Sequence, residues 1–287
     1  MSPRIAKSRP RARTKARAQA GARATGPRPR HEKPPQRPPT AAAKARANQI
    51  LDLLEQAHPE ATCALHWRTP YELVMATILS AQCTDERVNM VTPALFARYP
   101  DAASLAAARP ADVERMIRPT GFFRAKTKSL LGCARGLFER HGGEVPRSLD
   151  VLVKLPGIGR KTASVVLGHA YDVAEGIAVD THVLRVSNRL GIADSDDPLV
   201  VERQLMARIP RERWTRTTDL LIFHGRKICI ARRPLCGQCP VFALCRWEHR
   251  QAFALGGPPR ARRATSPSRQ GVSRRRTPTP GRSPGAE

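Results

Sequence analysis

Apolar residues recur at the spacing of an α-helix in almost every segment between residues 47 and 225, and this periodicity restricts the fold more than any other feature. Ile50, Leu51 and Leu54 form such a stripe in the first predicted helix. Further helices are predicted from Thr69, from Thr84 and at about 103–108, 110–117, 124–140, 148–154, 160–170, 181–190, 198–208 and 214–225. No segment shows convincing strand alternation, so we expect an all-α fold with short connecting turns.

Two of these helices carry recognisable end signals. The string T-P-Y-E at 69–72 places a Thr at the cap, a Pro at the first helical position and a Glu three residues after the cap, which predicts a capping box. The helix at 124–140 is followed by Gly142 and Gly143, which predicts a glycine C-cap.

The formal net charge of +26 is concentrated at the two ends of the chain. Residues 1–40 contain 12 Lys and Arg with one acid, and residues 250–287 contain nine with one acid, so residues 41–249 are only mildly basic. Few large apolar residues occur at either end, and we expect disordered tails at 1–43 and 249–287 that raise affinity for a polyanion. An organellar transit peptide is the alternative for the first tail, although its prolines oppose an amphipathic helix. No apolar run is long enough to predict secretion or a membrane span.

Four of the seven cysteines lie within one short stretch, with the spacing C-x6-C-x2-C-x5-C. They are Cys229, Cys236, Cys239 and Cys245. One close pair with two outlying cysteines favours an iron–sulfur cluster over zinc, which usually uses two close pairs, while unliganded thiols stay possible. Arg232 and Arg233 lie between the first two cysteines, where they are expected to point outward at phosphates.

The string L-P-G-I-G-R-K-T-A at 155–163 predicts a helix, a glycine hairpin and a second helix over about 149–168. Backbone N–H groups of such a turn, and the positive end of the second helix, bind phosphate oxygens without regard to base sequence. The candidate DNA-binding residues here are Leu155, Pro156, Gly157, Ile158, Gly159 and Arg160. An ordinary helix–helix turn is the structural alternative.

Lys161 and Asp180 are the candidate catalytic residues. Lys161 lies in the first turn of the second helix, where the helix dipole disfavours a cation and favours the neutral, nucleophilic amine. Asp180 follows the apolar run I-A-V and precedes the predicted helix at 181–190, so it is also a good N-cap. If the fold brings the two together, an amine and a carboxylate suit chemistry that passes through a cationic sugar. A phosphate-binding role for Lys161 remains open.

Together with L-S-A-Q-C-T-D at 79–85, V-D-T-H at 179–182 and H-G-R-K-I-C at 224–229, these strings resemble the endonuclease III family of DNA glycosylases and AP lyases in the helix-hairpin-helix superfamily. The resemblance runs from about Ala47 to Trp247. It implies a two-lobed fold with DNA held between the lobes. Residues 63–173 would form a six-helix barrel, and residues 44–62 with 174–248 would form a lobe that holds a [4Fe–4S] cluster on the four cysteines.

The resemblance also implies the activity. Lys161 matches the nucleophile and Asp180 the catalytic aspartate of enzymes that remove oxidised pyrimidines from duplex DNA and cleave the strand 3′ to the abasic site by β-elimination. Gln82 matches the residue that fills the gap left by the flipped base. Phe122 stands where bacterial relatives commonly have a leucine wedge, which leaves the opposite-base preference open. The segment between Lys161 and Asp180 appears one residue longer than in many bacterial members.

The implied partner is double-stranded DNA with an oxidised pyrimidine or an abasic site, bound by a monomer in a bacterial cytoplasm, with a nucleus or mitochondrion as the alternative. The adenine glycosylase branch shares the hairpin and the cluster but lacks a lysine at position 161, and the polar chain after Arg250 does not predict its extra domain. A catalytically silent DNA-binding protein is the alternative from another class, and the Lys161 and Asp180 pair argues against it.

Overall fold

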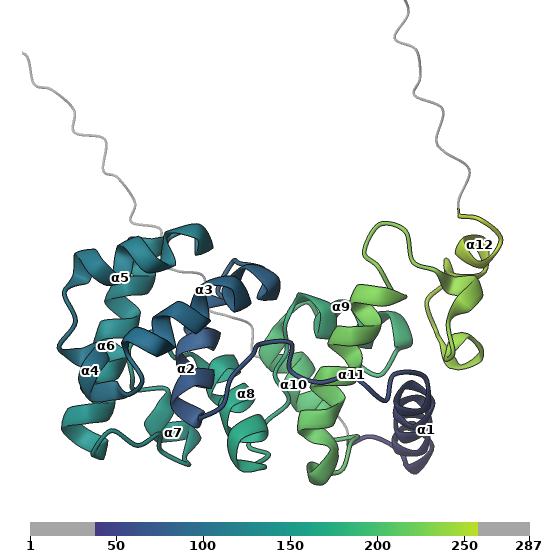
Figure 1. Cartoon of the computed structure of the whole chain (residues 1–287). Helices are drawn as coiled ribbons and strands as arrows, with labels where there is room; N and C mark the ends of the chain where they lie inside the picture. The colour runs from purple at the N-terminus through teal and green to yellow at the C-terminus, as the bar shows by residue number, and fades with distance from the viewer. Residues whose placement is uncertain (1–37, 258–287) are drawn as a thin grey trace, which may run out of the picture. The chain divides into compact units, whose positions relative to one another are not determined.

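A computed structural model describes residues 38–257, and every regular element in that range is helical. Figure 1 shows the α-helices with their labels. They are α1 (Ala41–Ala57), α2 (Pro70–Leu79), α3 (Asp85–Arg98), α4 (Ala102–Ala106), α5 (Pro110–Ile117), α6 (Phe123–His141), α7 (Leu149–Leu152), α8 (Arg160–Tyr171), α9 (Thr181–Leu190), α10 (Pro198–Met206), α11 (Trp214–Lys227) and α12 (Arg250–Ala254). The predicted all-α class is confirmed.

The end signals in the sequence are mostly used as predicted. Thr69 caps α2 by accepting the N–H of Glu72, and Gly142 ends α6 in the left-handed region at φ 62°. The capping box at 69–72 is only half formed, because the Glu72 carboxylate accepts the backbone N–H of Arg68 at 2.6 Å. The same carboxylate also binds the Arg68 guanidinium at 2.6 Å, and this pairing explains why the reciprocal bond goes to Arg68.

One hydrophobic cluster is built by helices α2 to α8. Its fully buried members include Leu73 and Leu79 of α2, Leu105 of α4 and Leu130 of α6. Leu167 of α8 joins the same cluster, so the helix that follows the glycine hairpin is anchored by its apolar face. Burying each such side chain contributes roughly 1.5–3 kcal/mol, which fixes the hairpin on a rigid support.

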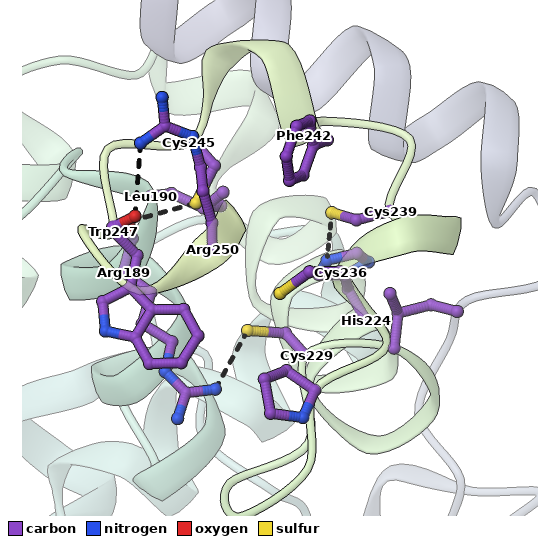
Figure 2. Close-up of a pocket in the computed structure, with 12 residues that line it drawn as sticks. Arg189, Leu190, His224, Cys229, Cys236, Cys239, Phe242, Cys245, Trp247 and Arg250 are labelled. Atoms are coloured by element: carbon purple, nitrogen blue, oxygen red, sulfur yellow. Dashed lines mark hydrogen bonds between the residues drawn. The ribbon is translucent and has the colours of Figure 1, made fainter. Parts of the chain in front are cut away.

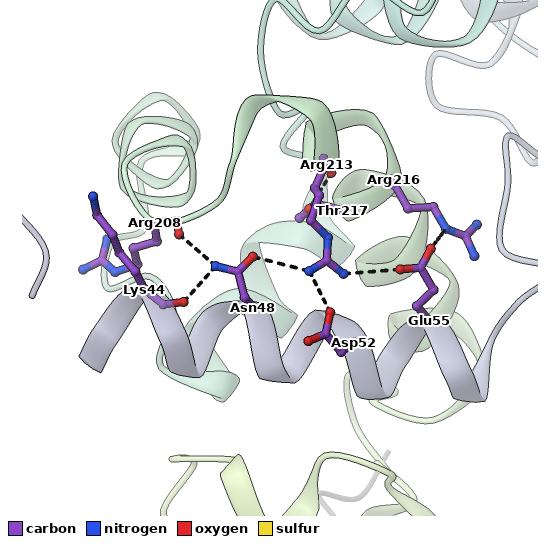
Figure 3. Close-up of polar contacts among 8 residues, drawn as sticks. All are labelled: Lys44, Asn48, Asp52, Glu55, Arg208, Arg213, Arg216 and Thr217. Carbon is purple, nitrogen blue, oxygen red and sulfur yellow. Dashed lines mark hydrogen bonds and ion pairs between the residues drawn. The ribbon is translucent and has the colours of Figure 1, made fainter. Parts of the chain in front are cut away.

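A second hydrophobic cluster joins α1 to the helices that follow α8. Leu51 and Leu54 of α1 pack with Val186 of α9 and Leu221 of α11, although α1 precedes the first cluster in the chain. Polar contacts fasten α1 at the edge of this cluster. Figure 3 shows the network between α1 and the segment that begins α11.

Arg213 is the centre of that network. Its guanidinium donates to Asp52 at 2.7 Å, to Glu55 at 3.3 Å and to the side-chain oxygen of Asn48 at 3.4 Å. Arg216 donates from Nε to the other oxygen of Glu55 at 3.0 Å. Because two arginines share one carboxylate, α1 is held in a defined register along α11.

Helices α8 and α11 belong to different clusters and touch closely. A Cβ atom at Gly168 would lie 2.4 Å from Oγ1 of Thr215, so this approach requires a glycine. One residue further along, Nε2 of His169 lies 3.3 Å from Oδ1 of Asp219, and both side chains are largely buried. Arg226 of α11 binds Asp85 of α3 at 2.8 Å. The two clusters are thus joined by direct polar contacts.

Ordered helix extends into both segments that the sequence assigned to tails, because α1 begins at Ala41 and α12 covers Arg250–Ala254. The expectations for residues 1–37 and 258–287 lie outside the described residues. Within residues 38–257 no helix is both long enough and apolar enough to cross a membrane.

Candidate active site and cysteine cluster

The glycine hairpin connects α7 to α8 as the sequence predicted. Gly157 has φ +80°, and a Cβ atom there would lie 2.7 Å from Cβ of Ser129, so both its backbone conformation and its packing need glycine. Gly159 differs, since its φ is −91° and a Cβ atom there would meet nothing within 4 Å. Gly159 is the N-cap of α8 and supplies no capping side chain. The first N–H groups of α8 therefore face a space that a phosphate could enter.

Lys161 and Asp180 lie together. The Nζ atom of Lys161 is 3.9 Å from Oδ2 of Asp180, with the lysine side chain half exposed and the aspartate side chain largely buried. The other oxygen, Oδ1, accepts the N–H groups of His182 and Val183 at 2.8 Å each and so caps α9. This cap fixes the carboxylate in its orientation and leaves one oxygen facing the amine.

A small open pocket lies beside Lys161. Its walls come from the start of α8, from the extended segment 177–179 and from α10, with Val179, Leu199 and Glu202 among its lining residues. Oγ of Ser164 is buried in this wall and has no hydrogen-bond partner among the residues that the structure describes. A polar atom left without a partner in a pocket is suited to bind a ligand.

Gln82 and Phe122 share an unusual backbone. Their φ angles are 52° and 46°, in the left-handed region that few residues other than glycine adopt, and both side chains are exposed. The Phe122 residue is 68% exposed, which is a large apolar area to leave in water. Strain of this kind persists where the surrounding structure enforces it, and it clusters at functional sites.

The other hairpin residues differ in how accessible they are to a ligand. Leu155 and Ile158 are buried in the first hydrophobic cluster, so only their backbone atoms are available to a ligand, whereas Pro156 is exposed. Arg160 is not free, because its Nε donates to both oxygens of the buried Glu202 at 2.9 and 3.1 Å. This ion pair ties α8 to α10.

The four predicted cysteine ligands line one small cavity, shown in Figure 2. None of them forms a disulfide. Within residues 38–257 no three His, Cys, Asp or Glu side chains converge on a point where a single metal ion could bind. Four sulfurs around a cavity fit a cluster of several iron atoms better than a tetrahedral zinc ion.

Burial by itself disfavours the thiolate form of these sulfurs, so a positive metal centre is needed to hold them deprotonated. Burial raises the pKa of the Cys239 thiol to about 12 and also raises the pKa values of Cys236 and Cys245. Thiols in such a site lose their protons when a positive metal replaces them. When bound, a [4Fe–4S] cluster supplies four iron–thiolate bonds that fix the course of the loop.

Side chains outside the sequence motif surround the sulfurs. Nη1 of Arg189 lies 3.5 Å from Sγ of Cys229, and its guanidinium stacks over the Trp247 ring at 4.2 Å. Nε2 of His224 lies 3.6 Å from Sγ of Cys239. Burial, together with the neighbouring His58 ring, lowers the pKa of His224 to about 4, so this ring is neutral near pH 7.

Sequence reasoning did not single out these contacts. His224 opens the string H-G-R-K-I-C, but nothing in its spacing indicated that it would face a cysteine. The predicted pair Arg232 and Arg233 is exposed on the loop between the first two cysteines, and neither has an ion-pair partner in the described part of the chain. Both guanidiniums are therefore available to an anion.

Several known proteins are similar to this chain in sequence and in structure. Residues 75–211 match the HhH-GPD superfamily of base excision DNA repair proteins, and residues 229–245 match the iron–sulfur binding domain of endonuclease III. Endonuclease III of Synechocystis is 51% identical over 205 residues, which cover 71% of this chain and 94% of the relative. The chain belongs to the endonuclease III family. The protein is therefore a base excision repair DNA glycosylase with AP lyase activity, and its cofactor is a [4Fe–4S] cluster.

Two further relatives support the assignment to the endonuclease III family. Endonuclease III of Bacillus subtilis is 47% identical over 197 residues, which cover 68% of this chain and 90% of the relative. A solved structure described as a trapped endonuclease III–DNA covalent intermediate is 45% identical, with a TM-score of 0.67 over 71% of this chain and 95% of that chain. The zinc, unliganded-thiol and silent DNA-binding alternatives are set aside by this membership.

Proposed function

We propose that Lys161 is the nucleophile of this endonuclease III family member and that Asp180 is its catalytic carboxylate. The observation that carries the proposal is the 3.9 Å approach of Nζ to Oδ2 beside a pocket, on an aspartate whose other oxygen is fixed by two backbone N–H groups. Positioning a nucleophile and an anion in this way lowers the entropy cost of reaction and stabilises a cationic sugar.

The proposed reaction starts from a nucleotide flipped out of the duplex. The Nζ lone pair of Lys161 forms a bond to C1′ while the bond from C1′ to the base breaks, and the base departs with that electron pair and takes up a proton. Nitrogen then loses a proton, for which Oδ2 of Asp180 is a near acceptor, and the sugar ring opens to a Schiff base. Loss of a proton from C2′ expels the 3′ phosphate, which cleaves the strand.

We assign the DNA contacts to three exposed regions. The backbone of the hairpin from Leu155 to Gly159 binds phosphate, with Pro156 exposed beside it, and the free part of the Arg160 guanidinium adds charge. Gln82 and Phe122 enter the duplex at the flipped nucleotide, where an aromatic ring stacks on bases. Arg232 and Arg233 bind the phosphates of the same DNA from the loop between the first two cysteines.

The substrate we propose is duplex DNA with an oxidised pyrimidine or an abasic site. Residues 63–173, with their barrel helices, and residues 44–62 with 174–248 act as the two lobes that hold it. We expect the protein to act as a monomer. The bacterial origin of the relatives favours a site of action on cytoplasmic DNA, with a nucleus or mitochondrion as the alternative compartment. This chain has a lysine at position 161, which favours the endonuclease III activity over that of the adenine glycosylase branch.

Borohydride trapping on duplexes with one thymine glycol or one abasic site tests this function. The hydride reduces the Schiff base and leaves protein bound covalently to DNA, and Lys161→Gln is expected to abolish that product. Lys154→Gln is the matched control, because Lys154 is an exposed lysine just before the hairpin. A Lys161→Gln protein that still traps would remove the nucleophile from position 161, and base removal confined to adenine opposite 8-oxoguanine would place the enzyme in the other branch.

A further inference from the structure

Two buried histidines form a line of contacts from the end of α1 to the cluster site. His58 is the C-cap of α1 and is 7% exposed, and His224 in α11 is fully buried. Nε2 of His58 lies 3.1 Å from Nδ1 of His224, and Nε2 of His224 lies 3.6 Å from Sγ of Cys239. Figure 2 shows the His224 ring beside the Cys239 sulfur. The reaction at Lys161 uses neither histidine.

The sulfur at the end of this line fixes the direction of its hydrogen bonds. A cysteine that binds iron is a thiolate, which accepts hydrogen bonds and has no proton to donate. Nε2 of His224 is therefore the donor to Cys239. A neutral imidazole has a single N–H, so Nδ1 of His224 must accept, and Nε2 of His58 must supply the proton. Each ring thus carries its proton on Nε2.

We propose that His224 donates a hydrogen bond to the Cys239 thiolate and raises the reduction potential of the [4Fe–4S] cluster, with His58 as the positioning residue that keeps His224 in its donating tautomer. Hydrogen bonds to ligand sulfurs withdraw electron density from the iron and are one of the determinants of cluster potential. Partners of metal ligands in an outer shell commonly fix a tautomer in this manner.

Packing alone does not account for two histidines here. A buried ring nitrogen without a partner costs about 1–3 kcal/mol, whereas an apolar ring of similar size would carry no such cost. The His58 ring already has an apolar neighbour in Phe223, at 5.2 Å between ring centroids. The polar atoms of both rings are instead aligned end to end toward one sulfur. Through this line, the docking of α1 is linked to the electronic state of the cluster.

Variants of the full-length, cluster-loaded protein test the proposal. We would compare His224→Phe, His58→Phe and His58→Gln with His66→Gln, an exposed control. The readouts are the midpoint potential from protein-film voltammetry and the iron–sulfur stretching bands in resonance Raman spectra. His224→Phe should shift the potential to more negative values and the bands to higher frequency. His58→Phe should shift both in the same direction by less, and His58→Gln, whose amide N–H can still donate, should stay near wild type.

Two results would overturn the proposal. A loaded His224→Phe protein with the wild-type potential and Raman spectrum would show that the ring only packs, even if its melting temperature falls. If the His224→Phe protein does not hold the cluster, the His58→Phe protein provides the test. A wild-type potential and Raman spectrum in His58→Phe would show that His58 does not position His224. Pulsed electron–nuclear resonance on reduced wild-type protein with nitrogen-15 histidine needs no variant. It should detect a histidine nitrogen coupled to the cluster, and no coupling would refute the hydrogen bond.

Discussion

Nζ of Lys161 lies 3.9 Å from Oδ2 of Asp180, on a carboxylate whose Oδ1 accepts two backbone N–H groups at the start of α9. The two oxygens of one side chain thus have separate partners. One holds the beginning of a helix, and the other faces the amine. Substitutions that change one oxygen at a time can separate the structural contribution of Asp180 from its chemical contribution.

Asp180→Asn should keep the cap and lose the chemistry. Asparagine caps helices about as well as aspartate, so the free energy of unfolding should change by less than about 0.5 kcal/mol, whereas Asp180→Ala should lose about 1 kcal/mol. Both variants lose the carboxylate near Lys161, and single-turnover strand cleavage should fall by roughly 10²–10⁴. Urea denaturation and quench-flow cleavage of an abasic duplex measure the two effects. An Asp180→Asn enzyme with the wild-type rate would confine Asp180 to capping.

The two hairpin glycines should respond differently to alanine. Gly157→Ala meets both a φ of +80° and a Cβ contact of 2.7 Å with Ser129, so it should destabilise the protein by about 1–3 kcal/mol. Gly159→Ala has ordinary backbone angles and open space, so stability should be unchanged or slightly higher. A methyl group at Gly159 should instead weaken binding to undamaged duplex DNA, measured by fluorescence anisotropy. Equal stability losses in both variants would contradict this distinction.

Phe122 should matter to DNA and little to folding. Phe122→Gly removes an exposed ring from a residue with left-handed backbone angles. Glycine relieves about 1–2 kcal/mol of backbone strain in the folded state. This gain offsets the greater freedom of the unfolded chain, which costs about 0.4–1 kcal/mol. The melting temperature should therefore not fall, while base removal from duplex DNA slows. Phe138→Ala is the control, since Phe138 is an exposed phenylalanine within α6, the helix that Phe122 precedes as N-cap. If Phe122→Gly and Phe138→Ala remove the base from duplex DNA at the same rate, Phe122 does not act as a wedge.

Alkaline conditions should destabilise the first hydrophobic cluster through its buried acids. Burial raises the pKa of Cys133 to about 12, whereas a thiol in the unfolded chain titrates near 8.5. The unfolded state therefore loses its proton first. The stability that Cys133 contributes is fully present below about pH 8.5 and is lost as pH rises toward about 12. Burial also raises the pKa of Tyr71, which acts in the same direction.

The free energy of unfolding measured at about pH 8 and about pH 10.5 tests this dependence. Wild type should lose stability between the two values, and Cys133→Ala and Tyr71→Phe should each lose less than wild type. Cys133→Ala also leaves a cavity, so its stability is lower at both pH values. The quantity to compare is therefore the loss of unfolding free energy between the two pH values. A Cys133→Ala difference equal to the wild-type difference would show that the thiol does not contribute.

Local signals in the sequence were sufficient for the long helices and for their caps, while the catalytic roles of Lys161 and Asp180 stay a prediction. Thr69, Gly142 and Asp180 act as caps because capping depends on a few neighbouring residues, which a single sequence contains. Contacts between distant segments were not predictable in the same manner. The bond from Arg160 to Glu202 and the contact of His224 with Cys239 depend on how helices pack, and no spacing rule encodes them.

The segment just after the family match shows the same contrast. The short helix α12 was missed because Arg250–Ala254 has too few apolar residues for a periodic pattern. It is ordered because Phe253 stacks on Trp247 at 5.2 Å between ring centroids, beside the cysteine cavity. Helix propensity alone is marginal in so short a segment, and tertiary packing supplies the rest.

Helix α1 packs with segments that are synthesised much later, since its partners in the second hydrophobic cluster lie between residues 177 and 241. On the ribosome, α1 emerges first, and its apolar face is fully covered only after α9 and α11 have left the exit tunnel. The apolar partners of α2 to α8 in the first hydrophobic cluster lie within one continuous stretch, so this cluster can form during translation. The apolar face of α1 is therefore buried only late in synthesis. Premature termination before α11 would leave that face exposed and α1 open to proteolysis.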